Sequence, residues 1–218
     1  SLGMIHSFTR PIAYGFFYPH LFPILLAAVF SALVGMAFIY GHQKMTSYLS
    51  RVKKCRWWLP VLGGAGVIAV GLIFGKEVMG TGDRIIGDSF GGRILPLACV
   101  LIIAGKILST NLTVGFGQSG GLTYPAVILG CLGANLVSHI SGATGGEVHQ
   151  ALLCAGMAAS MAAVLNTPLA AAIIMLEAFG LSVAAPAAIG AVLGFIIGRP
   201  KVIYRYRDTG VWKKSRGI

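Results

Sequence analysis

The chain has few charged residues, and acidic residues are the scarcest. Of its 218 residues, 11% are charged and 6 are Asp or Glu, whereas 56% are hydrophobic, and the mean hydropathy is +0.82. Soluble domains carry about 25% charged residues, which they need to cover a surface that faces water. The composition therefore excludes an ordinary soluble domain. It predicts an all-α integral membrane protein, with residues 1–218 forming a single transmembrane domain.

The residue patterns that carry enzyme or metal chemistry are also missing. The five histidines show neither HxxxH nor HExxH spacing, the four cysteines form no CxxC pair, and no Ser-His-Asp or Cys-His set stands out. Cys99, Cys131 and Cys154 lie within apolar runs, which is typical of small core residues. We therefore expect no enzymatic activity, no metal site and no cofactor.

The net charge of +11 comes largely from two basic patches. Residues 44–56 and 199–216 each flank an apolar span, and basic residues in such positions are typical of the cytoplasmic side. We therefore place the loop 44–56 and a basic tail, 199–218, in the cytoplasm, with the chain in a bacterial-type inner (plasma) membrane. Attraction to anionic lipid headgroups explains this charge better than nucleic-acid binding, so membrane lipid is the expected partner.

Glycine and proline are abundant, which argues against a bundle of straight helices. The 31 glycines and 9 prolines favour short, broken or closely packed helices. Pro168 is expected to divide the apolar run 151–176 into two helices, because proline and the residue before it resist continuing a helix. The stretch 76–93 is predicted to be mostly loop, with a short interfacial piece. The other predicted membrane helices are 21–40, 57–75, 94–108, 122–139 and 178–198.

A glycine-rich stretch, 115–125, joins two of these apolar segments and contains no charge. It leads into a helical pattern that has Pro125 in its first turn. The first amide N–H groups of a helix have no partner within the helix and carry the positive end of its dipole, so such a junction is a natural anion site. A tight turn or a packing device is the alternative. Irregular backbone at membrane depth is tolerated only beside protein or a water-filled cavity, which favours a pathway.

Three side chains each allow two interpretations. Lys106 either extends its ammonium group to the membrane interface or stands in the membrane as a cation that concentrates anions. Glu177 ends the long apolar run as a helix-terminal carboxylate or as part of a proton relay. Tyr204 is an interfacial anchor, or it donates its hydroxyl to an anion if the tail re-enters the pore.

Residues 106–115 (KILSTNLTVG), running on through residues 119–125 (SGGLTYP), resemble the bacterial ClC chloride channel and proton/chloride antiporter family. That family has a K-x-L-x-T-x-x-T-x-G segment that leads into a G-G-x-F-x-P anion-binding motif. Further family-like segments are AGMAA at 155–159, TPL at 167–169 followed by Glu177, and GTGD at 80–83. The likeness implies one inverted repeat of short, tilted and broken transmembrane helices, a ClC-type half.

The resemblance also implies the site residues. In the family, the backbone amides of the two residues after the glycine pair hold the central chloride. The pair here is Gly120 and Gly121, so the implied donors are the amides of Leu122 and Thr123. Thr123 replaces the family's phenylalanine, which leaves the amide in place but alters the wall of the site.

The family's central tyrosine donates its hydroxyl to the same ion, and its counterpart here looks most like Tyr204. An ungapped count from Gly198 puts Val202 at that position instead. Lys106 would add positive potential along the path. The implied ligand is chloride or a similar anion, and no other cofactor is expected.

The family's first half supplies a G-S-G-I-P serine and a G-R-E-G-P glutamate, the external gate, and neither motif occurs in this sequence. The chain thus resembles the C-terminal half, and half a pore cannot conduct by the family mechanism. We expect one of three cases: a complementary N-terminal half on a separate chain or missing segment, a chain that is itself a fragment, or a half-length protein that pairs with itself. Gly190, Gly194 and Gly198, at every fourth position, predict a helix-packing surface, and with the family's habit they point to a homodimer.

The expected function is therefore anion (chloride) transport, as a channel or a proton-coupled antiporter. The alternative is a non-conducting structural or assembly subunit of a larger membrane complex, which the missing gate motifs and Thr123 favour.

Overall fold

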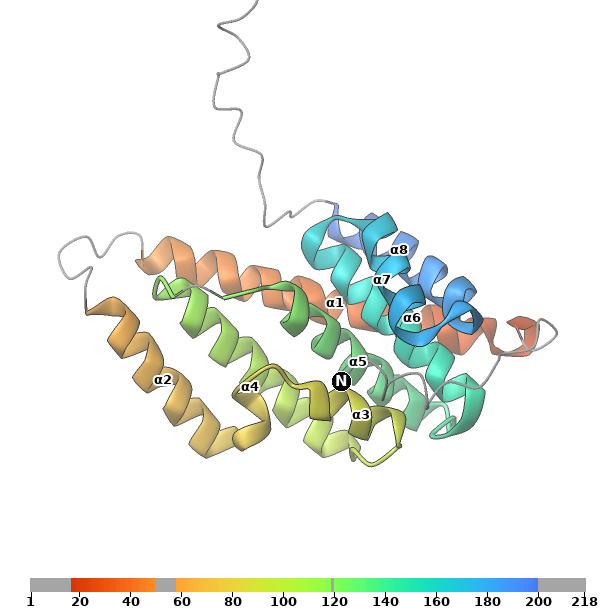
Figure 1. The fold of residues 1–218 in the computed structure, drawn as a ribbon, viewed down its shortest axis with the longest axis horizontal. Helices are drawn as coiled ribbons and strands as arrows, with labels where there is room; N and C mark the ends of the chain where they lie inside the picture. The colour runs from red at the N-terminus through yellow and green to blue at the C-terminus, as the bar shows by residue number, and fades with distance from the viewer. Residues whose placement is uncertain (1–16, 50–57, 119, 200–218) are drawn as a thin grey trace, which may run out of the picture.

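The structure is a computed structural model that describes residues 17–49, 58–118 and 120–199 (Figure 1). The elements of these ranges are all helical. In chain order they are α1 (Phe17–Leu49), α2 (Leu59–Phe74), the 3-10 turn η4 (Lys76–Val78), α3 (Asp83–Phe90), α4 (Pro96–Gly115), α5 (Thr123–Ile140), α6 (Gly146–Leu165), α7 (Pro168–Phe179), the 3-10 turn η5 (Leu181–Val183) and α8 (Ala184–Gly198).

Among the described residues, five helical segments are long and apolar enough to cross a membrane. They are His20–Leu49, Pro96–Gly115, Thr123–Ile140, Gly146–Leu165 and Leu181–Gly198. Two further apolar helices, α2 and α7, have 16 and 12 residues. At about 1.5 Å per residue they extend roughly 24 and 18 Å, less than the hydrocarbon core of about 30 Å. The mixture of long and short helices confirms the prediction of an all-α membrane fold with broken helices.

The predicted break at Pro168 is confirmed. Helix α6 ends at Leu165, Asn166 adopts a left-handed conformation with φ 58°, and α7 starts at Pro168. Proline is tolerated in a helical first turn because the missing N–H would have had no partner there. Two helices that pack against each other thus replace what hydropathy alone would predict to be one long span.

Helix α6 is the centre of the molecule, and almost all of its residues from His149 to Val164 are buried. It packs against α1, α5 and α8. In Figure 1, α6, α7 and α8 gather at one end, α2 and α4 lie side by side at the other, and α1 runs past both groups. The site region described below lies on α5, between these two groups.

The glycine face of α8 packs against α6 of the same chain. A Cβ atom on Gly190, Gly194 or Gly198 would lie 2.0, 2.0 or 2.4 Å from the carbonyl oxygens of Ala155, Ala159 and Ala163, respectively. The prediction of a helix-packing surface is therefore confirmed. The prediction that this face forms a homodimer interface is wrong, because α6 of the same chain already covers it.

Two predictions about connecting segments are also wrong. The stretch 76–93, expected to be mostly loop, contains η4 and the two-turn helix α3. Its Ile85 is buried against α4 and α5, so tertiary packing stabilises a helix that would be too short to form alone. The basic loop 44–56 begins later than expected, because α1 continues to Leu49. Residues 50–57 and 200–218, which hold the rest of that loop and most of the basic tail, lie outside the described residues.

Candidate anion site

The glycine-rich stretch ends at the N-terminus of α5, as predicted. The helix begins at Thr123 with Leu122 as its N-cap, and the Ala126 N–H donates to the Leu122 carbonyl at 3.2 Å, closing the first turn. Among the described residues, no side chain caps this terminus. The backbone N–H groups of Leu122, Thr123 and Tyr124 therefore form an uncapped N-terminus with a positive dipole end.

The loop before α5 is tied to neighbouring helices on one side and exposed on the other. The Gln118 N–H donates to the Thr113 carbonyl at 3.1 Å, and its side-chain amide donates to the Pro60 carbonyl at the start of α2. Gly120 and Gly121 are exposed, and a Cβ on Gly121 would meet no atom within 4 Å. The backbone on this side of the N-terminus is thus open to another molecule.

Leu122 and Thr123 point in different directions. The Leu122 side chain is 5% exposed and packs with Phe38, Leu129 and Val164, which anchors the start of α5 in the core. Thr123 is exposed. These two residues thus form an uncapped helix N-terminus, and anion binding there stays a prediction.

Lys106, in α4, is buried, with 3% of its surface exposed. Its ammonium group donates to the carbonyl oxygens of Val78, at 3.3 Å, and Gly80, at 2.5 Å. The Ser109 hydroxyl lies 3.4 Å from the same Val78 oxygen. Lys106 therefore holds the segment after α2 in place, an arrangement that neither interpretation of the sequence included. Its effect on an anion path stays a prediction.

Asp83, the first residue of α3, accepts two side-chain hydrogen bonds. The Thr81 hydroxyl donates to Oδ2 at 2.9 Å, and the Tyr124 hydroxyl donates to Oδ1. The Tyr124 hydrogen bond, then that of Thr81, and to a smaller extent the Lys106 charge, hold the pKa of the Asp83 carboxyl below its ordinary value. From the sequence, residues 80–83 are identified only as a family-like loop, and Tyr124 is included only within the 115–125 stretch, with no role for its side chain.

His149 connects α3, α5 and α6, and no structural role for it was predicted from the sequence. Its Nε2 lies 2.7 Å from the Ser89 carbonyl oxygen and its Nδ1 2.6 Å from the Ser138 hydroxyl, which itself donates to the Ala143 carbonyl. The buried ring thus links α3, the end of α5 and the start of α6. The part of the chain that the structure describes contains no group of three His, Cys, Asp or Glu residues able to hold a metal ion.

Replacing His149 with phenylalanine is expected to lower stability by about 2 kcal/mol. Phenylalanine keeps the ring in a buried site but removes both polar contacts, each with a net value of about 1 kcal/mol. Thermal unfolding in detergent measures the change. His139→Phe is the control, since the His139 ring has one such contact, at 2.9 Å to the Ile94 carbonyl oxygen, and should lose about half as much. Equal melting temperatures for wild type and His149→Phe would contradict the structural role.

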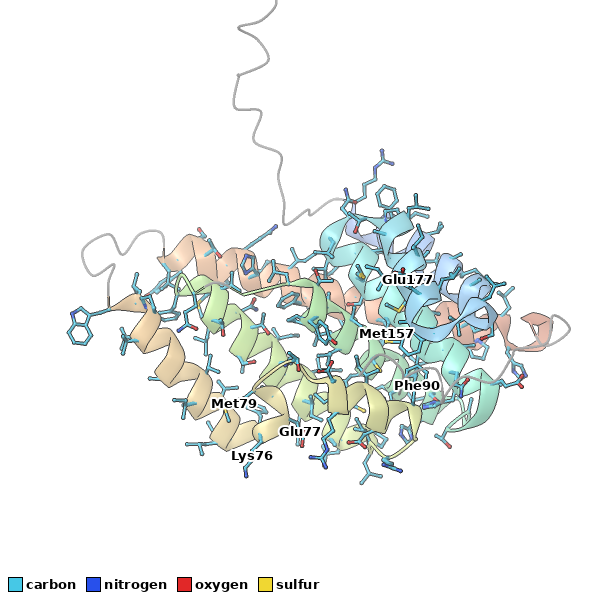
Figure 2. All side chains as sticks on the ribbon, viewed as in Figure 1. Lys76, Glu77, Met79, Phe90, Met157 and Glu177 are labelled. Carbon is cyan, nitrogen blue, oxygen red and sulfur yellow. The ribbon has the colours of Figure 1, made fainter. Side chains whose placement is uncertain are left out.

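Three other residues from the sequence analysis lie in α7 or outside the described ranges. Glu177 is exposed in the last turn of α7, and Figure 2 shows it among the α6–α8 group, away from Lys76 and Glu77 beyond the end of α2. A proton-relay role for Glu177 stays untested. Tyr204 and Val202 lie outside the described residues.

The sequence matches a known family along most of its length. The sequence model of the voltage gated chloride channel family aligns with residues 4–199. The chain belongs to this family. This is a family of membrane channels rather than of enzymes, so membership confirms the prediction that the chain is not an enzyme.

Two curated relatives and one solved structure show how much of a family member is present. An uncharacterised protein of Methanocaldococcus jannaschii is 31% identical over 94% of this chain and 50% of its own length. A chloride/fluoride channel protein of Pseudomonas syringae pv. tomato is 24% identical over 89% of this chain and 43% of its own. The crystal structure of a CLC-type fluoride/proton antiporter superposes with a TM-score of 0.69 at 20% identity, over 90% of this chain and 47% of that one. The chain thus spans about half the length of these relatives.

Proposed function

We propose that the chain forms one wall of an anion pathway through a membrane, with the amides of Leu122 and Thr123 as donors to the ion. The observation that carries the proposal is the uncapped N-terminus of α5, preceded by the exposed Gly120 and Gly121. Backbone N–H groups and the helix dipole favour an anion there. Small halides are the substrate class, because the names of one relative and of the matching structure refer to chloride or fluoride.

The pathway requires a second wall. The chain spans about half the length of its relatives, and the backbone at Gly121 faces open space. We assign the chain to the C-terminal half, from the motif order described above, and a complementary N-terminal half supplies the gate. Tyr204 is a further candidate donor to the ion. A homodimer formed through a surface other than the glycine face of α8, and the cytoplasmic placement of residues 44–56 and 199–218, complete this proposal.

In this proposal, the positive charge of Lys106 attracts the ion electrostatically without direct contact. Its ammonium group is buried against the carbonyls of Val78 and Gly80, so it is already hydrogen-bonded. The same observation favours the second candidate function, a non-conducting structural or assembly subunit, in which Lys106 serves the fold alone.

Flux through reconstituted liposomes separates the two functions. The chain is co-purified with its complementary half and reconstituted in liposomes loaded with chloride or fluoride, and efflux is followed with ion-selective electrodes after valinomycin is added. We expect flux of at least one halide above that of liposomes holding either half alone. Dependence of this flux on a proton gradient distinguishes an antiporter from a channel. A stable complex that passes neither halide would contradict transport and support the non-conducting subunit.

A further inference from the structure

The segment between α2 and α3 is fastened to two helices of the membrane core. Its backbone needs glycine, since Gly75, Gly80 and Gly82 have φ values of 98°, 92° and 85°. On one side, Lys106 of α4 binds the carbonyls of Val78 and Gly80. On the other side the segment meets α5, where a Cβ on Gly82 would lie 2.5 Å from the Ile128 side chain.

The contact with α5 is completed by Asp83. Both carboxylate oxygens are occupied, one by the Thr81 hydroxyl and one by the Tyr124 hydroxyl. Asp83 also stands in the first turn of α3, where the helix dipole favours a negative charge. The two hydrogen bonds therefore hold the carboxylate in one orientation, and the helix dipole favours its charge. We call the Thr81–Asp83–Tyr124 arrangement the α3–α5 latch.

Tyr124 of the latch directly follows the two proposed anion donors in the sequence. Leu122 anchors one side of the α5 N-terminus in the core, and Tyr124, the second residue of α5, anchors the other through Asp83. The amides of Leu122 and Thr123 are set between these two anchors. A backbone donor contributes fully to anion binding only when its direction is fixed before the ion arrives.

We propose that Asp83 and Tyr124 are positioning residues that fix the direction of the Leu122 and Thr123 amides, so that halide affinity depends on the latch although neither side chain touches the ion. The inference rests on the proposed function. The positioning role also explains why the family-like loop 80–83, which is distant from α5 in the sequence, contacts the N-terminus of that helix.

Because the latch residues are exposed, they can be substituted without unfolding the protein. Asp83 and Tyr124 are both exposed, and exposed polar pairs contribute little to global stability. Loss of the latch should therefore affect the local geometry of the site and leave the melting temperature nearly unchanged. A purely structural role would show the opposite pattern.

The test is halide titration calorimetry on the purified complex of the chain with its complementary half. Asp83→Ala and Tyr124→Phe are each expected to weaken halide binding roughly three- to tenfold, and the double variant no more than either alone, because both break one contact. Asp83→Asn retains an acceptor for Tyr124 and should restore part of the affinity. Asp88→Ala, which removes the ion pair between this residue of α3 and Arg93 beyond the helix end, and Tyr48→Phe, at an exposed tyrosine of α1, are the controls and should bind as wild type.

The outcomes distinguish this inference from the proposed function. Wild-type affinity in Asp83→Ala or Tyr124→Phe, while the wild type binds halide, overturns the latch alone. Additive losses in the double variant also overturn it, since they would mean two independent effects. A wild-type complex that binds neither chloride nor fluoride overturns the proposed function, and the positioning role with it.

Discussion

Gly194→Val is expected to prevent the protein from reaching its native fold. A Cβ atom at position 194 would lie 2.0 Å from the carbonyl oxygen of Ala159 and 2.7 Å from its carbonyl carbon. These are backbone atoms of α6, so no change of rotamer relieves the overlap, and α8 must separate from α6. Inserting bulk into a packed interior costs about 1–3 kcal/mol when side chains can adjust. A backbone clash puts the loss at roughly 3 kcal/mol or more.

The matched control is Ala188→Val, which adds bulk on the exposed side of α8. Yield of folded protein after detergent extraction and the thermal melting temperature are the measurements. We expect the control to resemble wild type and Gly194→Val to give little folded protein or a strongly lowered melting temperature. Equal melting of the two variants would mean that α8 does not pack on α6 in this way.

Gly194 also shows which aspects of helix packing can be predicted from the sequence. The spacing of Gly190, Gly194 and Gly198 predicts close helix packing, because glycine lets backbones approach. Spacing alone does not name the opposite helix. The partner is Ala155, Ala159 and Ala163, which repeat the same four-residue interval on α6. Matching small-residue repeats on two helices was a signal that would have identified this pair.

The local backbone of the site was predictable for a physical reason. Glycines followed by a helical pattern with Pro125 in its first turn leave few other positions for the start of α5, and the helix begins at Thr123. Pro168 marks the start of α7 for the same reason. Each is a local effect of residue chemistry on the backbone, so it is visible in a single stretch of sequence.

Contacts between distant residues were not predictable. Asp83 and Tyr124 lie 41 positions apart, and His149 lies 60 positions from Ser89. Lys106 was singled out, but its acceptors are backbone carbonyls, which any residue type provides. Helix α3 was missed because eight residues are too few to form a stable helix alone, and the packing of Ile85 against α4 and α5 is a long-range contact.

An amide-to-ester change at Thr123 should weaken halide binding by about tenfold or more. Replacing the residue with the corresponding α-hydroxy acid keeps the side chain, removes one N–H group and weakens the Leu122 carbonyl as the acceptor of the Ala126 N–H. Hydrogen bonds to charged groups contribute about 1.5–3 kcal/mol, which corresponds to roughly 10- to 150-fold in affinity. Helix α5 should persist, because the N–H of a first helical residue has no acceptor within the helix.

The matched control carries the same ester at Leu97, an exposed residue in the first turn of α4. That position is also a helix N-terminus, so it tests whether any such terminus responds to the lost N–H. Folding of both ester variants is checked by their melting temperatures, which should stay close to that of wild type.

The measurement that tests the central claim most directly is the halide dissociation constant of three proteins, each in complex with the complementary half: wild type, the Thr123 ester and the Leu97 ester. An anion held by the α5 amides predicts weakening of about tenfold or more for the Thr123 ester and none for the Leu97 ester. Equal halide affinity in all three would contradict an anion site at Leu122 and Thr123.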